Sequence, residues 1–138
     1  MLTYAVPCAA PAEAAWPLMA RPARWSEWAP HVRGAWGLGS PEVRPGARGA
    51  VRLLGLVPVP ARILDKRPGR SWSWRVGPVE LDHLVDPLPR GCLVSVRVRA
   101  AAPLEAALKV SYGPLIALLV RRLAAVAQED RSAPRPPR

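Results

Sequence analysis

The stretch 92-CLVSVRVRAAAPLEAALKVSYGPLIALLVRRLAAVAQED-130 carries two hydrophobic periods in succession. From Cys92 to Val98 apolar and polar residues alternate, which is typical of a strand with one covered face and one face in water. From Pro103 onward apolar residues recur every three or four positions, which predicts an amphipathic helix. The stripe consists of Leu104, Leu108, Tyr112, Leu115, Leu119, Leu123 and Val126. The sequence therefore predicts a long C-terminal helix, 103–130, that covers a half-buried sheet.

Two features limit this helix. Gly113 and Pro114 interrupt the pattern, and a proline inside a helix removes a backbone hydrogen bond, so we expect a kink or short break there. The last segment, 131-RSAPRPPR-138, is rich in Arg and Pro and is predicted to be a disordered tail.

The segment before Cys92 contains a series of strand-length runs separated by Gly- and Pro-containing turns. These runs are 34–39, 49–57, 58–66, 71–76 and 79–86, and residues 2–9 form an earlier one. Between them, residues 11–32 read as one or two short helices because Pro17, Pro22 and Pro30 forbid a single long one. The short connections favour antiparallel pairing of successive strands.

The order of these elements predicts an α+β fold. We expect a curved antiparallel sheet of about seven strands wrapped around the long C-terminal helix, with two short helices between the first and second strands. Residues 1–130 form one domain in this interpretation. The space between helix and sheet is either filled by large side chains or left as a cavity.

The composition narrows the function classes. The formal net charge is +10, but Lys66 and Lys109 are the only lysines among the 20 basic residues, and the arginines are scattered rather than gathered on one face. Specific nucleic-acid binding is therefore not expected. Cys8 and Cys92 lack metal-ligand spacing and are predicted to be small buried thiols. No signal peptide or membrane-spanning run is apparent, so we expect a cytoplasmic protein without membrane insertion.

Five stretches give the sequence a family resemblance. They are 24-RWSEWAPHV-32, 45-PGARG-49, 67-RPGRSWSWRV-76, 82-DHLVDPLPRG-91 and 112-YGPLIALLVRRL-123. With the element order, they resemble the START-like (SRPBCC) superfamily, and more narrowly its bacterial polyketide cyclase/dehydrase and lipid-transport branch. The resemblance implies a helix-grip fold and a hydrophobic cavity between sheet and C-terminal helix. Some members of this branch act in biosynthesis by cyclising or dehydrating polyketide chains, and many only bind or carry a ligand. This chain is slightly short for the family, so a small or tryptophan-filled cavity is expected.

His83 and Tyr112 are the candidate catalytic residues. His83 falls between Leu81 and Val85 on the predicted inward face, where an imidazole could act as a general acid or base, or simply bond a neighbouring group. Tyr112 lies on the helical stripe next to the expected break, where its hydroxyl could polarise a ligand carbonyl or reach the surface.

Tryptophans dominate the candidate ligand-binding residues. Trp25 and Trp28 are three residues apart and would share a helix face; the resemblance implies that this short helix closes one end of the cavity. Trp72 and Trp74 share one strand face, and Trp36 could join either cluster. Plain packing is the alternative for each of them. Leu81, Leu108 and Leu115 are expected to complete the apolar lining.

Charged residues are weaker candidates. Asp65 is expected in a turn or at an inward strand end. Glu80 and Asp82 face outward by alternation, where they would pair with arginines of the outer sheet face. The sequence contains no zinc pattern, no phosphate-binding loop and no Ser-His-Asp signature, so we expect neither metal nor cofactor.

Two functions remain open from the sequence. In one, the protein binds a hydrophobic, polyketide-like small molecule and catalyses its cyclisation or dehydration without a cofactor. In the other, it is a non-catalytic carrier or binding protein for a lipid or other apolar metabolite. We expect a monomer or homodimer in either case.

Overall fold

The structure is a computed structural model that describes residues 1–30, 32–53 and 58–132. Its elements follow the order β1 (Leu2–Cys8), α1 (Ala12–Ala20), the 3-10 helix η1 (Pro22–Glu27), β2 (Val32–Trp36), β3 (Arg48–Leu53), β4 (Val59–Arg67), β5 (Ser71–Val76), β6 (Val79–Leu88), β7 (Gly91–Arg99), α2 (Ala102–Ser111) and α3 (Gly113–Ser132). The expected strand 49–57 is thus described only to Leu53, and most of the expected tail lies outside the described residues. α3 ends at Ser132, two residues beyond the expected helix end at Asp130, so it includes the first two residues of that tail.

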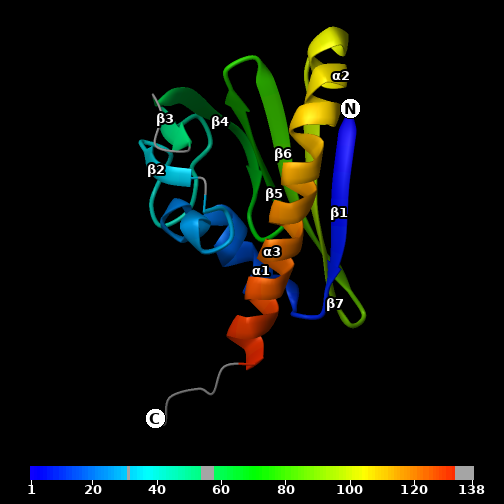
Figure 1. Ribbon diagram of the computed structural model, residues 1–138. Coiled ribbons are helices and arrows are strands. Elements are labelled where there is room, and N and C mark those ends of the chain that lie inside the picture. The colour runs from blue at the N-terminus through cyan, green and yellow to red at the C-terminus, as the bar shows by residue number, and fades with distance from the viewer. Residues whose placement is uncertain (31, 54–57, 133–138) are drawn as a thin grey trace.

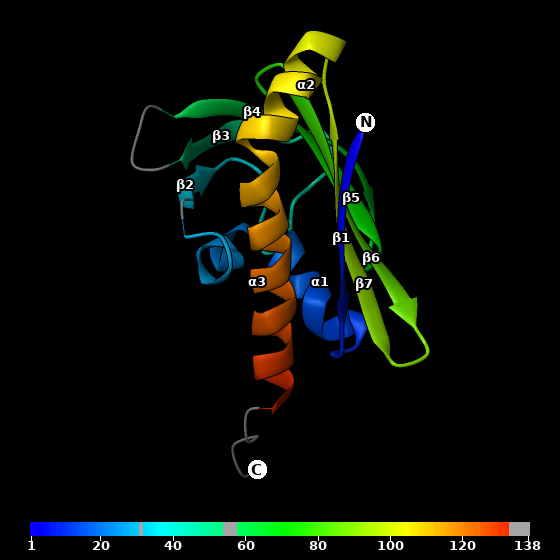
Figure 2. The same ribbon diagram turned by 45° about the vertical axis from the view of Figure 1, so that its right-hand side comes forward.

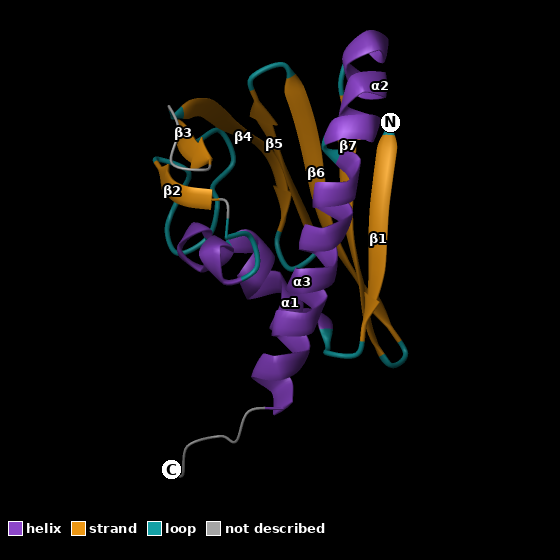
Figure 3. Ribbon diagram, viewed as in Figure 1, coloured by secondary structure: helices purple, strands orange, loops and turns teal. Residues whose placement is uncertain are grey.

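The strands form one antiparallel sheet in the order β1-β7-β6-β5-β4-β3-β2 (Figure 3). The first strand pairs with the last, from Leu2 opposite Val98 to Cys8 opposite Cys92, and the strands between them pair in sequence. The helix α3 crosses the sheet beside β1, and α1 packs against α3 (Figures 1 and 2). The predicted α+β helix-grip arrangement is confirmed.

Cys8 and Cys92 are buried free thiols at the end of the β1–β7 pair. Cys8 donates a hydrogen bond from Sγ to the carbonyl of Ala124 in α3, over 3.6 Å. Burial raises the pKa of the Cys92 thiol to about 12, with a further contribution from neighbouring Cys8. Both therefore act as small packing residues that join strand to helix, as the sequence predicted.

The predicted helix break lies at Tyr112–Gly113, and α2 and α3 are bent by 62° there. Gly113 is buried, and a Cβ at this position would lie 2.5 Å from the hydroxyl oxygen of Tyr4, so only glycine fits without displacing that side chain. No single helix in the described residues is long and apolar enough to cross a membrane; α2 and α3 together pass by length and composition, but with this bend between them.

The face of α3 that meets the core differs from the predicted stripe at its start. The buried residues of α3 are Gly113, Val120, Leu123, Ala124 and Ala127, and Ile116 packs against the core beside them. The continuous stripe in the sequence placed Leu115 on this face. Leu119, Leu123 and Val126 of the stripe do face the core, but at the start of α3 Ile116, and not Leu115, lines the cavity.

A bulge in β4 changes the alternation that the sequence suggested for Asp65. The register shifts between Ile63 and Lys66, so that Lys66, rather than Asp65, turns toward the core and is half-buried. Its Nζ lies 2.9 Å from Oε1 of Glu42. Asp65 is exposed within the strand, so its expected place in a turn or on the inward face is wrong.

The outer face of the sheet carries a row of charges across neighbouring strands. Arg48 lies opposite Arg62, Arg62 opposite Arg75, and Arg75 opposite Glu80. Arg99 engages both Glu80, at 3.5 Å, and Asp82, at 2.6 Å, which confirms the predicted outward pairing of these carboxylates. Within the described residues, no ion pair involves Arg48, Arg62 or Arg75. Like charges directly opposite each other destabilise a sheet.

We therefore expect Arg62→Glu to stabilise the fold, because it replaces two repulsive cross-strand pairs by two attractive ones. The free energy of unfolding should rise by about 1 kcal/mol at low ionic strength and the gain should shrink in about 0.5 M NaCl. Urea denaturation at both salt concentrations measures this. Arg90→Glu, in the turn after β6, makes the same change in net charge away from the row. An equal gain in both variants would show that net charge, not the row, is responsible.

Candidate functional site

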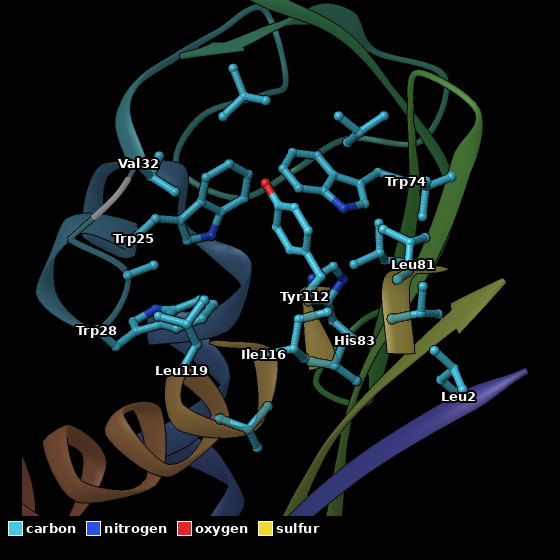
Figure 4. Close-up of a pocket in the computed structure, with 18 of the residues that line it drawn as sticks. Leu2, Trp25, Trp28, Val32, Trp74, Leu81, His83, Tyr112, Ile116 and Leu119 are labelled. Atoms are coloured by element: carbon cyan, nitrogen blue, oxygen red, sulfur yellow. The ribbon is translucent and has the colours of Figure 1, made fainter. Parts of the chain in front are cut away.

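A cavity of about 280 Å³ lies between the inner face of the sheet, η1 and the two C-terminal helices (Figure 4). Among the described residues, its lining consists of aliphatic side chains, four tryptophans, His83 and Tyr112. The aliphatic residues are Leu2, Ala29, Val32, Val51, Val76, Val79, Leu81, Val96, Val98, Leu108, Ile116, Leu119 and Val120. The inner face of a curved sheet and a bent helix cannot meet along their whole length, so a space remains between them.

Three tryptophans and His83 form one wall of this cavity. Trp25 stacks on Trp72 with ring centroids 5.6 Å apart, and Trp72 stacks on His83 at 4.0 Å and an interplanar angle of 6°. Trp74 stands edge-on to all three rings, at 5.2 Å, 5.4 Å and 6.0 Å. Such stacked and edge-to-face contacts add to the stabilisation from burial. We call these four residues the aromatic wall.

The end of α1 holds the aromatic wall in place. The indole N–H groups of Trp25 and Trp72 both donate to the carbonyl of Met19, at 2.9 Å and 3.1 Å. Trp28 donates to the carbonyl of Leu18 at 2.8 Å. The last carbonyls of a helix have no partner within it, so these indoles satisfy groups that would otherwise be buried unpaired. The 3-10 helix η1 and strand β5 are thereby both joined to α1 through side chains that line the cavity.

Trp74 differs from the other cavity tryptophans. Its Nε1 is buried and has no hydrogen-bond partner among the described residues. In Figure 4 this nitrogen lies on the edge of the indole that faces the space between Tyr112 and Leu81. An indole N–H is a donor only, so an oxygen acceptor that enters the cavity beside it would satisfy this group.

His83 is buried in β6, and its Nδ1 also lacks a hydrogen-bond partner among the described residues. Burial lowers its pKa to about 3, with the backbone of Trp72 acting in the opposite sense. The imidazole is therefore neutral across the physiological pH range. A neutral imidazole offers one donor and one acceptor nitrogen, but it is not a ready source of protons.

Tyr112 caps the C-terminus of α2 at the helix break and is half-exposed. In Figure 4 its hydroxyl points between the rings of Trp25 and Trp74, whereas His83 lies at the other end of the phenol. The two candidate catalytic residues therefore share the cavity, but their polar groups do not converge on one point.

The family comparison agrees with this geometry. The family model described as polyketide cyclase / dehydrase and lipid transport matches residues 2–128. The chain belongs to this family. Membership implies that the protein binds a hydrophobic ligand. No match to a curated protein was found.

Solved structures share the fold at low sequence identity. Protein NE0264 from Nitrosomonas europaea superimposes with a TM-score of 0.75 and 13% identity, over 96% of this chain and 96% of that chain. DynU16, a protein from the dynemicin biosynthetic locus, gives 0.67 and 17%, over 88% of this chain and 46% of that chain. Ara h 8.0201 gives 0.64 and 12%, over 93% and 97%. At these identities the likeness concerns the fold alone.

In this member of the polyketide cyclase / dehydrase and lipid transport family, the cavity brings together eight of the ten residues that the sequence singled out: Trp25, Trp28, Trp72, Trp74, Leu81, His83, Leu108 and Tyr112. Trp36 lies elsewhere, because it belongs to β2 on the outer side of the sheet edge. It is 46% exposed, and the guanidinium of Arg52 lies 5.4 Å from its ring. Leu115 is not part of the lining, whereas the next residue, Ile116, is.

No group of three or more His, Cys, Asp or Glu side chains among the described residues could hold a metal ion. His31 lies outside the described residues. The one polar feature of the cavity that the sequence analysis did not single out is the unpartnered N–H of Trp74. The alternation of β5 placed its ring inside, but no sequence signal shows which indoles find a carbonyl.

The depressed pKa of His83 makes a prediction for stability. Its pKa is about 3 in the folded protein and about 6.5 when unfolded, so the unfolded chain takes up a proton that the native protein refuses. The free energy of unfolding should be at its full value above pH 6.5 and fall by about 1.5 kcal/mol between pH 6.5 and pH 5. His83→Gln should remove this loss. Urea titrations of both proteins at these pH values measure it. Parallel pH dependences would contradict a buried neutral histidine.

Proposed function

We propose that the protein binds a hydrophobic, polyketide-like small molecule in the cavity and shields it from water. The observation that carries this proposal is the cavity itself: a partly open space of about 280 Å³ whose described lining holds no charged side chain and few polar groups. Ligand pockets are mostly apolar, with a few placed polar groups that set orientation. The aromatic wall offers flat surfaces for rings, which suits a polyketide-derived ligand better than a flexible chain.

Filling the cavity tests this proposal. Ile116→Trp places a large ring in the lining, whereas Leu118→Trp makes a similar change on the exposed face of the same helix, where Leu118 is 53% exposed. We expect wild type and Leu118→Trp to bind 2-naphthol with a Kd on the order of 10–100 μM. Ile116→Trp should bind it at least tenfold more weakly. Isothermal titration measures all three, and equal affinities would place the ligand outside the cavity.

A catalytic role is the second candidate, favoured by the polar atoms of the cavity that lack partners. In this version the cavity folds a polyketide chain so that ring closure with loss of water is favoured, without a cofactor. Orientation alone can supply much of the rate of an intramolecular reaction. His83 would bond the substrate as a neutral group and Tyr112 would donate to a carbonyl. The separation of these two groups and the low pKa of His83 favour binding over catalysis.

Native mass spectrometry distinguishes the two candidates. Wild type and His83→Gln are produced in the same cells and analysed under gentle conditions, so that bound molecules are retained. We expect both proteins to carry the same molecule, because a neutral glutamine side chain can replace the neutral imidazole in the lining. A wild-type ligand that is lighter by one water than the ligand of the variant would instead establish catalysis.

A further inference from the structure

The polar groups of the cavity specify part of the ligand's chemistry. Of its four indole N–H groups, those of Trp25, Trp28 and Trp72 donate to carbonyls of α1, and that of Trp74 is left over. A buried N–H without an acceptor costs about 1–3 kcal/mol. No described residue near Trp74 accepts a hydrogen bond from its N–H. A ligand with an oxygen acceptor can therefore bind with an additional hydrogen bond, which a pure hydrocarbon cannot form.

The charges of the cavity limit the ligand in a second way. The described lining contains no Lys, Arg, Asp or Glu, and His83 is neutral. An ion moved from water into such surroundings loses its hydration without gaining a counter-charge, which costs several kcal/mol. A carboxylate or an ammonium group inside the cavity is therefore disfavoured.

The volume of the cavity indicates the size of the ligand. An apolar cavity of about 150 Å³ accommodates benzene. The cavity here has nearly twice that volume, about 280 Å³, and one of its walls consists of aromatic rings. A compound of about two fused rings matches both the volume and the wall.

Resting on the binding function proposed above, we propose that the ligand is a neutral compound of about two fused rings. A carbonyl or hydroxyl oxygen on its edge accepts a hydrogen bond from Nε1 of Trp74. This hydrogen bond orients the rings in the cavity, and the other three tryptophans contribute surface but no hydrogen bond.

Three probes of similar size test each part of this inference. 1-Tetralone is neutral and carries a carbonyl, tetralin lacks the oxygen, and 1-naphthoate carries a negative charge. We expect wild type to bind 1-tetralone at least tenfold more tightly than 1-naphthoate. In Trp74→Phe the ratio of the tetralone to the tetralin affinity should fall by about two- to twelvefold, which corresponds to a net hydrogen bond of about 0.5–1.5 kcal/mol. Isothermal titration supplies the affinities.

Trp28→Phe is the matched control, since it removes an indole of the lining whose N–H is already bonded to Leu18. It should change the affinities for tetralone and tetralin by the same factor. Equal ratios in wild type and Trp74→Phe, or 1-naphthoate bound as tightly as 1-tetralone, would overturn the inference while leaving the binding function intact. Failure of all three probes to bind wild type would overturn the binding function as well. Circular dichroism confirms that each variant is folded.

Discussion

The carbonyl groups at the end of α1 are the constraint on which the cavity depends. All four of the last carbonyls accept a hydrogen bond from outside the helix: Pro17 from the backbone of Arg21, Leu18 from Trp28, Met19 from Trp25 and Trp72, and Ala20 from the backbone of Val43. A helix end buried without partners would be costly. Three of the hydrogen bonds that satisfy this helix end come from indoles, and they also fix the orientation of those rings in the cavity wall. The same interactions therefore stabilise the end of α1 and determine the shape of the cavity.

The bend between α2 and α3 accounts for the remaining space. A straight helix would have carried its apolar stripe along the sheet and closed the core. Because Gly113 lies against the hydroxyl of Tyr4 and the chain turns by 62° there, α3 packs beside β1 while α2 has no buried residue. Leu108 and Tyr112 before this turn, and Ile116 and Leu119 after it, line the cavity without filling it. The cavity is thus a consequence of helix geometry as much as of side-chain size.

The sequence predicted the fold and most of the lining because both depend on periodicity. Alternation placed Trp72, Trp74 and His83 on one side of the sheet, and the structure agrees. Periodicity fails where the backbone is irregular: Asp65 is exposed beside the bulge that follows Ile63, and just after the helix break Ile116 rather than Leu115 lines the cavity. Periodicity also cannot predict hydrogen bonds between residues that are far apart in the sequence. Which indole finds a carbonyl depends on where α1 ends in space, so the free N–H of Trp74 could not be predicted.

The protonation of His83 determines what kind of chemistry the cavity could support. Burial lowers its pKa to about 3, so the imidazole is neutral at pH 7. General acid–base catalysis is most effective when the pKa lies near the working pH, and here burial has moved it far below. The stacking of His83 on Trp72 at 4.0 Å further ties the ring to the wall instead of presenting it to a substrate. The same burial that makes the histidine a poor proton carrier makes it a good neutral lining group, and this favours recognition of a ligand over its conversion.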